Sequence, residues 1–439
     1  MIKGSRTRVR RHLGAIAVAL AVLTPALGGC GSDGGSSDSK TLEFWSQWRQ
    51  GEPQQQILQD AINAFHQKTG VTVKVQWAGR DVGKKIRAGA NVGKVPDLTD
   101  DASESLWLSY KNGQGFGLAD VYKSKLGDDD GSRTVADAVP ASAVTAYDTK
   151  DGPVVVPYMV LTTSLWFDGG ALPDVAANPP TTVDQFVATL DKIKQSGKAP
   201  IAADGTISDY NAYWLYQAAE HYMGAGWLHK AAEDKTGQMW SDPKFLQAAK
   251  FVERLAKGGY FIDGYQGSKL PAGQQRWAKG EAGFLLMGSW APADTSSYAK
   301  SGFDYRSIAF PTLDGQPGPV ETNFIGFGIP KKAKNADAAK QFIAFFMSNK
   351  WLSQIATKAQ NLTPDPAIPA PTGLKDVQTM LANAKSTNRP GDGLSGDLPD
   401  YWSGVFVAVD DKLFFGKATA EQTIQELQKR TVEYWKNNG

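Results

Sequence analysis

The stretch TLEFWSQWRQGEPQQQILQDAINAFHQKTGVTVKVQW, residues 41–77, sets the fold class of this chain. Its first five residues predict a short strand, and VTVKVQW at its end alternates as a second strand. The run EPQQQILQDAINAFHQKTG between them predicts a helix, because Pro53 stands near its start and Gly70 just beyond its end. A strand, a helix and a second strand in this order predict an α/β fold with a mostly parallel sheet.

The alternation of predicted strands and helices continues beyond this stretch. VPDLTD (95–100) predicts a strand and ASESLWLSYKN (102–112) a helix, and two apolar strands then follow close together in 152–167. The alternation restarts with a helix over 182–198 and the strand APIA (199–202), which predicts a second lobe. We therefore expect two α/β lobes joined by more than one strand, with residues 41–158 and 325–366 in the first lobe and 159–324 and 367–439 in the second.

The chain length also favours two domains, because 439 residues exceed what one core usually covers. A hydrophobic content of 41% is ample for real cores and excludes disorder of the whole chain. Five of the 47 Lys and Arg residues lie in the first 29 positions and none of the 45 Asp and Glu, so the remainder is slightly acidic. The composition therefore gives no reason to expect a nucleic-acid partner.

Residues 1–29 have the pattern of a secretion signal. Basic residues precede an apolar run from Leu13 to Leu27 that is too short to span a membrane comfortably. Cys30 follows and is the only cysteine, so an intramolecular disulfide and a Cys-based metal site are excluded. The Gly- and Ser-rich residues 30–40 predict a flexible tether. The segment Leu27-Gly28-Gly29-Cys30 resembles the lipobox of bacterial lipoproteins, which implies lipid on Cys30 and an anchor at the extracytoplasmic face of the membrane.

Motifs for phosphate, calcium or nucleophilic chemistry are missing. GRDVGKKI (79–86) is one residue short between its glycines and lacks the Ser or Thr of a phosphate-binding loop, and DDDGSR (128–133) lacks the spacing of a calcium loop. The histidines have no metal-ligand spacing, and no G-x-S-x-G motif occurs. We therefore predict no metal, no cofactor and no enzyme activity. A glycosidase with paired carboxylates stays open as the alternative, with Asp100, Asp101 and Glu104 as its candidate acids.

Tryptophan is the residue type that points to a ligand. All 13 tryptophans follow the signal, and several stand at predicted strand ends or loops: Trp45, Trp48, Trp290 and Trp402. A pyranose has one apolar face and a rim of hydroxyls, so its receptor needs aromatic rings flanked by polar side chains. FWSQWRQGE (44–52) supplies both kinds within nine residues. Tryptophans within apolar-periodic stretches are expected in cores: Trp77, Trp107, Trp166, Trp277, Trp351 and Trp435.

Several segments, in this order, resemble the extracellular solute-binding proteins of bacterial ABC importers, in the maltose-binding-like group for sugars. The segments are FHQKTGVTVKVQW, KVPDL, VPY, WAKGEAGFLLMGSW and GFGIPKKAKNADAAKQFIAFF, and the resemblance covers about residues 41–439. It implies a two-lobed periplasmic-binding-protein fold of type II, each lobe a sheet flanked by helices, with a hinge of several strands. It also implies a monomer that closes around a sugar and delivers it to a membrane permease.

The resemblance carries a set of ligand residues onto this chain. They are Trp45, Gln47, Trp48, Asp101, Ser103, Glu104, Tyr158, Trp214, Trp290, Asn323 and Trp402. For four of these residues, a structural role is an alternative to ligand binding. Tyr158 could pack in the hinge, Asp101 could cap a helix, Glu104 could favour the positive end of that helix, and Trp290 could join its helix to the sheet. A surface scaffold that binds another protein is a third functional class.

Overall fold

The computed structural model describes residues 40–127 and 131–439, so the predicted signal, Cys30 and nearly all of the tether lie outside the described residues. The first sheet has the strand order β2-β1-β3-β12-β6. Its strands are β1 (Thr41–Ser46), β2 (Thr72–Trp77), β3 (Leu98–Ala102), β6 (Val156–Leu161) and β12 (Asn323–Gly328). Strands β2, β1 and β3 are parallel, and β12 runs antiparallel to both of its neighbours. We call this sheet with its helices the first lobe.

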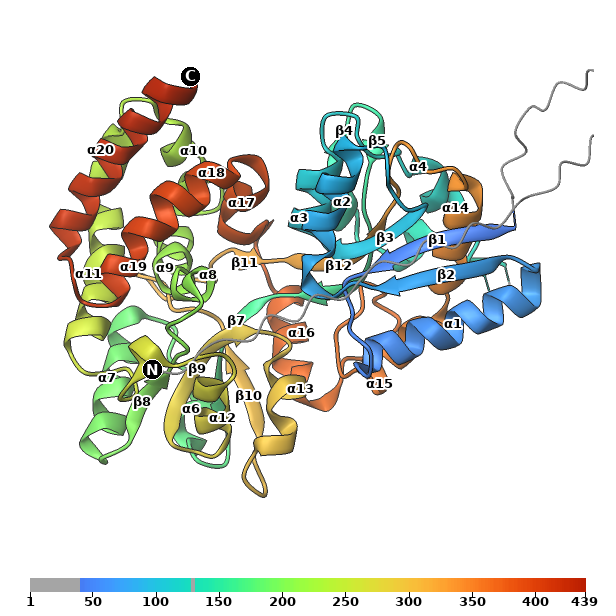
Figure 1. Ribbon diagram of the computed structural model, residues 1–439. Coiled ribbons are helices and arrows are strands. Elements are labelled where there is room, and N and C mark those ends of the chain that lie inside the picture. Colours follow the sequence, from blue (N-terminus) through green and yellow to red (C-terminus); the bar gives the residue numbers. More distant parts are fainter. Residues whose placement is uncertain (1–39, 128–130) are drawn as a thin grey trace, which may run out of the picture. The chain divides into compact units, whose positions relative to one another are not determined.

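The stretch 41–77 folds as its sequence predicts. Helix α1 (Pro53–Thr69) has Pro53 in its first turn and ends at Gly70, whose φ of 74° is the left-handed conformation that suits glycine. Side chains of β1 alternate between the two faces of the sheet. Phe44 packs against Phe342 of α14 on one face, whereas the Trp45 ring lies near Gly89 of α2 on the other. Helices therefore cover both faces of the first sheet (Figure 1).

The helices of the first lobe come from both halves of the sequence. They are α1, α2 (Val82–Asn91), α3 (Ser103–Tyr110), α4 (Ala119–Lys123), α5 (Ala141–Thr145), α14 (Ala336–Phe346) and α15 (Asn349–Thr357), and a short ribbon pairs β4 (Asp148–Thr149) with β5 (Gly152–Pro153). Phe65 of α1 meets Phe342 and Phe345 of α14 with ring centroids 5.3 and 5.4 Å apart. The returning segment 323–357 is thus part of this core.

A second sheet, with its own helices, forms the second lobe. Its strand order is β10-β7-β9-β8, with strands β7 (Thr163–Asp168), β8 (Ala199–Ala202), β9 (Ala282–Gly288) and β10 (Tyr305–Ile308). Every residue of β9 is buried, as its apolar run predicts. The confirmed fold class is α/β, with two separate sheets flanked by helices.

The helices of the second lobe fall in two ranges of the chain. The first range holds α6 (Pro173–Ala177), α7 (Val183–Gln195), α8 (Ser208–Asn211), α9 (Tyr213–Met223), α10 (Trp227–Glu233), α11 (Pro243–Lys257), α12 (Ala272–Ala278) and α13 (Ala291–Thr295). The second holds α16 (Lys375–Ala382), α17 (Leu394–Asp397), α18 (Pro399–Tyr401), α19 (Ala408–Phe414) and α20 (Ala420–Asn438), with a π-helical turn over Trp402–Val407. Among the described residues, no helix is both long and apolar enough to cross a bilayer.

The chain passes between the two sheets by several segments. β6 of the first sheet is followed after one residue by β7 of the second, and the short strand β11 (Val320–Glu321) leads through Thr322 into β12. β11 pairs with β13 (Thr387–Asn388). The Pro-rich segment near residue 362 also contacts the crossing, because Val160 N donates to Leu362 O at 2.9 Å. The first two crossings lie close to the predicted lobe boundaries, which remain predictions.

Candidate functional site

The carboxyl ends of β1 and β3 bring together the polar residues that the sequence separates. Gln47 follows β1, and Asp100 lies near the end of the neighbouring parallel strand β3. The Gln47 backbone N–H donates to Asp100 Oδ1 at 2.8 Å. Ligands of open α/β sheets bind at this edge. The Gln47 side chain is buried, and its Nε2 has no hydrogen-bond partner in the described protein.

Trp48 and Tyr158 form a buried chain of hydrogen bonds behind this edge. Trp48 Nε1 donates to Tyr158 Oη at 2.7 Å, and Tyr158 Oη donates to Asp100 Oδ2 at 2.8 Å. Trp48 is 6% exposed and Tyr158 is fully buried. The Arg80 guanidinium lies over the Trp48 ring at 4.7 Å from its centroid. In this arrangement the two aromatic side chains support the edge and present no free ring face to a ligand.

Burial shifts the acidity of the two aspartates of β3. Desolvation raises the pKa of Asp100 to about 7, against the hydrogen bonds from Gln47, Ser46 and Tyr158, which favour the charged form. Desolvation also raises the pKa of Asp101 to about 6, opposed by Ser105 and by the charge of Arg87. Adjacent residues of a strand point to opposite faces. The two carboxyls therefore do not face one common point.

The raised pKa of Asp100 predicts that stability falls as pH rises. Between an ordinary pKa of 3.8 and the folded value of about 7, the folded chain keeps a proton that the unfolded chain releases. The unfolding free energy should therefore fall from about pH 4 to pH 7 and then level off, by at most about 4 kcal/mol from this group. Urea unfolding at pH 5 and pH 8 measures the fall.

The pKa of Asp101 is raised too, so Asp101 adds to the pH dependence of stability in the wild type. Comparison with the variant Asp100→Asn isolates the contribution of Asp100. We expect the variant to show a smaller loss of unfolding free energy between pH 5 and pH 8. An unchanged slope in Asp100→Asn would mean that Asp100 does not hold a proton in the folded protein.

The first turn of α3 engages other parts of the chain. Ser103 Oγ donates to Asn323 Oδ1 at 2.7 Å, which ties α3 to the first residue of β12. The Glu104 carboxylate accepts from Arg389 Nε at 2.7 Å and Nη2 at 2.6 Å. Tyr147 Oη also donates to Glu104 at 2.8 Å. Ser103 and Glu104, predicted as ligand residues, therefore already have protein partners in this arrangement.

The second lobe contributes a row of aromatic rings. Trp290 follows β9 and is half-buried, and its ring lies 6.2 Å from that of Tyr210. Tyr210 is in turn 5.3 Å from Tyr213. A Cβ at Gly288 would collide with the Trp290 ring, so the small residue before the tryptophan makes room for it. This row ends in partly exposed rings and has the character that a sugar face requires.

Trp402 lies farther along this row and is more enclosed. Its ring is stacked on Phe406 at 5.2 Å, and it is 5.9 Å from Tyr216. Its Nε1 donates to Asp209 Oδ1 at 2.9 Å. Trp402 is only 9% exposed, so little of its surface is open to a ligand.

Charged groups connect the aromatic row with the first lobe. Desolvation raises the pKa of Asp294 of α13 to about 6; the charge of Arg80 opposes this shift and the charge of Glu52 adds to it. Arg80 is itself held by Glu52, with Nη2 and Oε1 2.8 Å apart, and its Nη1 donates to Gln47 O at 2.7 Å. Arg80 is therefore bound to the edge that carries Gln47, and its charge also acts on Asp294, which follows Trp290 by one helical turn.

Two predicted ligand residues lie apart from this group. Trp214 is 2% exposed in the core of the second lobe, where its ring packs against Phe261 at 5.6 Å and Phe310 at 6.2 Å. Trp45 is half-buried on the face of the first sheet that carries α2, near Gly89. Of the predicted ligand residues, Gln47 contacts Arg80 directly and Asp101 is within reach of its charge, whereas Trp214 lies in the core of the second lobe.

The sequence interpretation missed four residues of this group: Arg80, Asp209, Tyr210 and Asp294. Arg80 lies in GRDVGKKI, whose sequence excludes a phosphate-binding loop but gives no sign of another role. Tyr210 and Tyr213 stand in SDYNAYW (208–214), whose density of aromatic residues is the signal that could have indicated them beside Trp214. Asp294 follows Trp290 by one helical turn, a spacing that places both on neighbouring positions of a helix face.

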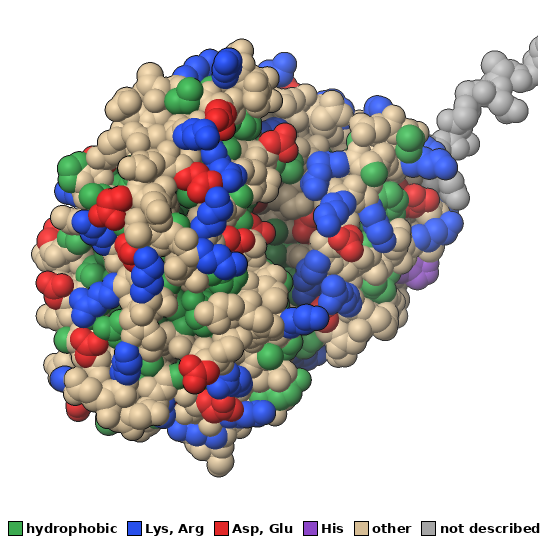
Figure 2. Space-filling model, turned by 60° about the vertical axis from the view of Figure 1, so that its left-hand side comes forward, with side chains coloured by type: hydrophobic (Ala, Val, Ile, Leu, Met, Phe, Trp, Pro, Cys, Tyr) green, Lys and Arg blue, Asp and Glu red, His purple; other side chains and the backbone are tan. Residues whose placement is uncertain are grey.

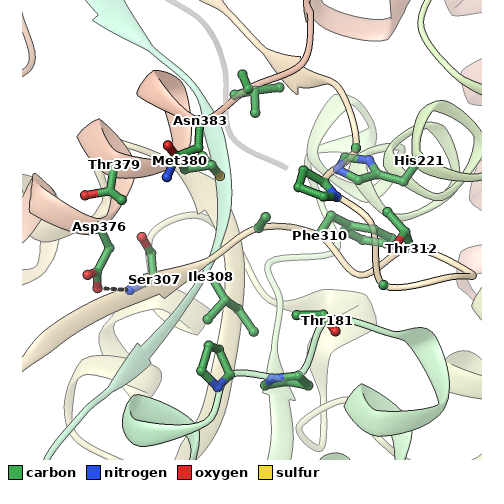
Figure 3. A pocket seen from close by; sticks show the side chains of 18 of the residues that line it. Thr181, His221, Ser307, Ile308, Phe310, Thr312, Asp376, Thr379, Met380 and Asn383 are labelled. Carbon is green, nitrogen blue, oxygen red and sulfur yellow. Dashed lines mark hydrogen bonds between the residues drawn. The ribbon is translucent and has the colours of Figure 1, made fainter.

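A cavity of about 340 Å³ lies elsewhere in the second lobe, between α16 and the chain that follows β10 (Figure 3). Its wall is mostly apolar, with Ile308, Phe310 and Met380 among the side chains that face it. Two polar side chains of the wall have protein partners: Asp376 accepts from Ser307 N at 3.0 Å, and His221 Nδ1 lies 2.9 Å from Gln217 O. None of the predicted ligand residues lines this cavity, so it is separate from the candidate site.

The face shown in Figure 2 carries charges of both signs. Figure 2 shows Lys and Arg side chains interspersed with Asp and Glu over the visible face, and a hollow near its middle. Within residues 40–127 and 131–439, no group of three or more His, Cys, Asp or Glu side chains could hold a metal ion. The candidate site therefore offers aromatic faces, amide and carboxylate hydrogen-bonding groups, and one arginine.

Comparisons with known proteins agree with this description. NgcE of Streptomyces coelicolor, a diacetylchitobiose binding protein, is 22% identical over 278 residues, which are 62% of this chain and 58% of NgcE. A "Probable sugar-binding periplasmic protein" of Mesorhizobium japonicum is 25% identical over 280 residues, 60% of this chain and 64% of its own. The matches thus span somewhat under two thirds of these relatives' lengths.

A solved structure of a sugar transporter from Bacillus licheniformis in complex with stachyose shares the two-lobed fold. It has a TM-score of 0.67 at 17% identity and covers 90% of this chain and 99% of its own. Residues 50–352, more than half of the chain, match the family described as bacterial extracellular solute-binding protein. The chain belongs to the family of bacterial extracellular solute-binding proteins.

Proposed function

We propose that this protein captures a sugar between its two lobes and delivers it to the permease of an ABC transporter. The observation that carries the proposal is the partly exposed row Trp290, Tyr210 and Tyr213, in which the charges of Arg80 and Asp294 act on Tyr210. Aromatic faces take the apolar side of a pyranose, and charged or amide groups take its hydroxyls. A relative named for diacetylchitobiose and a structural neighbour solved in complex with stachyose support a sugar as the cargo.

The proposed contact residues differ in part from those that the sequence suggested. Gln47, Asp101, Trp290 and Trp402 are retained, with Arg80, Tyr210 and Asp294 added. Trp48, Tyr158, Ser103, Asn323 and Glu104 support the site through the bonds described above, and Trp214 belongs to the core. Trp45 is proposed as a peripheral contact, because its half-buried ring stands at the end of β1.

The proposal is binding without chemistry. Hinge bending brings groups of both lobes to the ligand, and the ligand favours the closed arrangement through its greater affinity for it. A micromolar dissociation constant requires about −8 kcal/mol, which a few aromatic contacts and hydrogen bonds can supply after ordering costs. The protein acts as a monomer, held at the outer face of the membrane by lipid on Cys30.

The glycosidase alternative finds little support at the acids it requires. Both oxygens of Asp100 accept hydrogen bonds from the protein, and Glu104 is paired with Arg389. A general acid needs a carboxyl that can reach the glycosidic oxygen and a second carboxyl facing it across the bond. We therefore propose the receptor rather than the hydrolase.

Thermal-shift screening tests the proposed function. The full-length chain is melted alone and with diacetylchitobiose, maltose or stachyose in excess. Because the sugar binds only the folded form, a cognate sugar at 100 times its dissociation constant should add about 2.7 kcal/mol and raise the melting temperature by a few degrees. Chromatography of the same samples should return each sugar unchanged. Cleaved sugar would favour the hydrolase, and no shift with any saccharide would refute the receptor.

A further inference from the structure

Arg389 stands where the second lobe meets the first turn of α3. It follows β13, whose partner β11 leads directly into the crossing at Thr322. Thr322 N donates to Asn388 O at 2.8 Å, which fixes the backbone next to Arg389 on the crossing segment. The position of Arg389 is therefore tied to the segment about which the lobes would bend.

The Arg389 side chain is shared between carboxylates of different elements. It binds Glu104 of α3 through Nε and Nη2 at 2.7 and 2.6 Å, and it binds Asp397 of α17 through Nη1 at 2.9 Å. The two-pronged contact with Glu104 matches the planar fork of a guanidinium. The side chains of Arg389, Glu104 and Asp397 are 17%, 10% and 25% exposed. This ion pair is thus largely shielded from water.

Aromatic and backbone groups fix the same contact. The guanidinium lies 5.3 Å from the ring centroid of Trp107 and 5.2 Å from that of Tyr147. Trp107 Nε1 donates to Asp397 Oδ1 at 2.6 Å, and Lys111 Nζ donates to Gly396 O at 2.6 Å. Three residues of the first lobe, Glu104, Trp107 and Lys111, therefore bind the segment 389–397.

Glycine allows this close approach. A Cβ at Gly396 would collide with Glu104 Oε2 and would lie 2.8 Å from Arg389 Nη2. Gly393 has a φ of 81°, and a Cβ there would lie 2.8 Å from Arg389 Cζ. The backbone of 393–396 thus packs directly on the ion pair, with no room for a side chain or a ligand between them.

Glu104 also lies at the sheet edge that carries the candidate site. It follows the end of β3 within the first turn of α3, three residues after Asp101. A contact from this turn to the second lobe lies beside the sugar site, at the end that is near α3. We propose, on the basis of the proposed function, that Arg389 is a positioning residue that closes this end of the sugar site by holding segment 389–397 against α3 before a sugar binds.

The first test needs no sugar. For this measurement the chain carries Cys30→Ser, so that only the introduced cysteines react with the spin label. The labels are placed at Asp60→Cys of α1 and Lys192→Cys of α7, two exposed positions inside long helices of the two lobes. Double electron–electron resonance then gives the distribution of distances between the lobes. We expect a broader distribution in Arg389→Lys than in wild type, because lysine keeps the charge but cannot form the two-pronged bond.

Arg306→Lys is the matched control. Arg306 of β10 makes a similar pair with Asp376 of α16, at 2.7 Å, but both partners belong to the second lobe. The distance distribution should stay as in wild type. Glu104→Gln is a second variant that breaks the pair from the other side and should broaden the distribution as Arg389→Lys does.

The second test uses the sugar that gives the largest thermal shift. Arg389→Lys should weaken its binding roughly tenfold, mainly through faster dissociation, whereas Arg306→Lys should bind as wild type. Distance distributions identical to wild type in both Arg389→Lys and Glu104→Gln would overturn the proposal, as would failure of both to fold when Arg306→Lys folds. If the protein binds none of the tested sugars, the proposed function is refuted. The distance measurement would still decide whether Arg389 holds the two lobes together.

Discussion

Replacing Trp290 with alanine should weaken sugar binding about 100-fold, a loss of about 2.8 kcal/mol, while the sugar-free protein stays folded. Trp290 is half-buried at the end of the aromatic row, and the ring next to it is that of Tyr210. A ring that still exposes a face has unused area for a ligand, so its removal costs more in the complex than in the free protein. Titration of intrinsic fluorescence or calorimetry measures the loss.

Trp435→Ala is the control for Trp290→Ala. Trp435 is also half-buried, but it lies on α20, where its Nε1 donates to Ala232 O at 2.7 Å. Its removal should leave sugar affinity unchanged. Unfolding of sugar-free Trp290→Ala would instead show that Trp290 joins α13 to the sheet, and wild-type affinity in a folded Trp290→Ala would remove this ring from the site.

The local features of the fold could be predicted because they depend on near neighbours. Pro53 and Gly70 delimit α1 through backbone geometry that a few residues determine. The apolar run of β9 and the small residues before Trp290 likewise predict a buried strand that ends near a partly exposed ring. Strand and helix assignments of this kind require only periodicity and end signals.

The roles of individual polar residues could not be predicted in the same way. Glu104 looks like a free carboxylate in its own helix, but its partner Arg389 lies 285 positions away. Trp48 is followed by polar residues and looks like a ligand ring, yet Tyr158, 110 positions away, binds its Nε1. Whether a side chain near a sheet edge is free for a ligand thus depends on long-range partners that one sequence does not reveal.

The same reason explains Trp214 and Arg80. Trp214 stands in a Tyr-rich segment, and only the fold brings Phe261 and Phe310 around its ring. Arg80 belongs to no motif, and its role depends on its contacts with Glu52 and Trp48 and on the effect of its charge on Asp294. A helix cap or a buried strand is a local property, whereas membership of a site that spans two lobes is not.

The two interpretations of Trp48 give opposite expectations for Trp48→Ala, and the structure favours a large loss of stability. Trp48 is 6% exposed, donates a hydrogen bond to Tyr158 and is covered by Arg80. Removing such a ring should lower the free energy of unfolding by about 3–5 kcal/mol, because it leaves a cavity and removes the donor to Tyr158. Urea unfolding followed by far-ultraviolet circular dichroism measures this loss.

Trp48→Phe separates the ring from its hydrogen bond. Phenylalanine keeps most of the packing but has no Nε1, so its loss of unfolding free energy should be smaller, about 1–2 kcal/mol. If Trp48 were instead a free ring for the ligand, Trp48→Ala would unfold like wild type and would lose sugar affinity. A stable Trp48→Ala that no longer binds would therefore return this residue to the contact set, and it would mean that Arg80 moves off the ring when the sugar arrives.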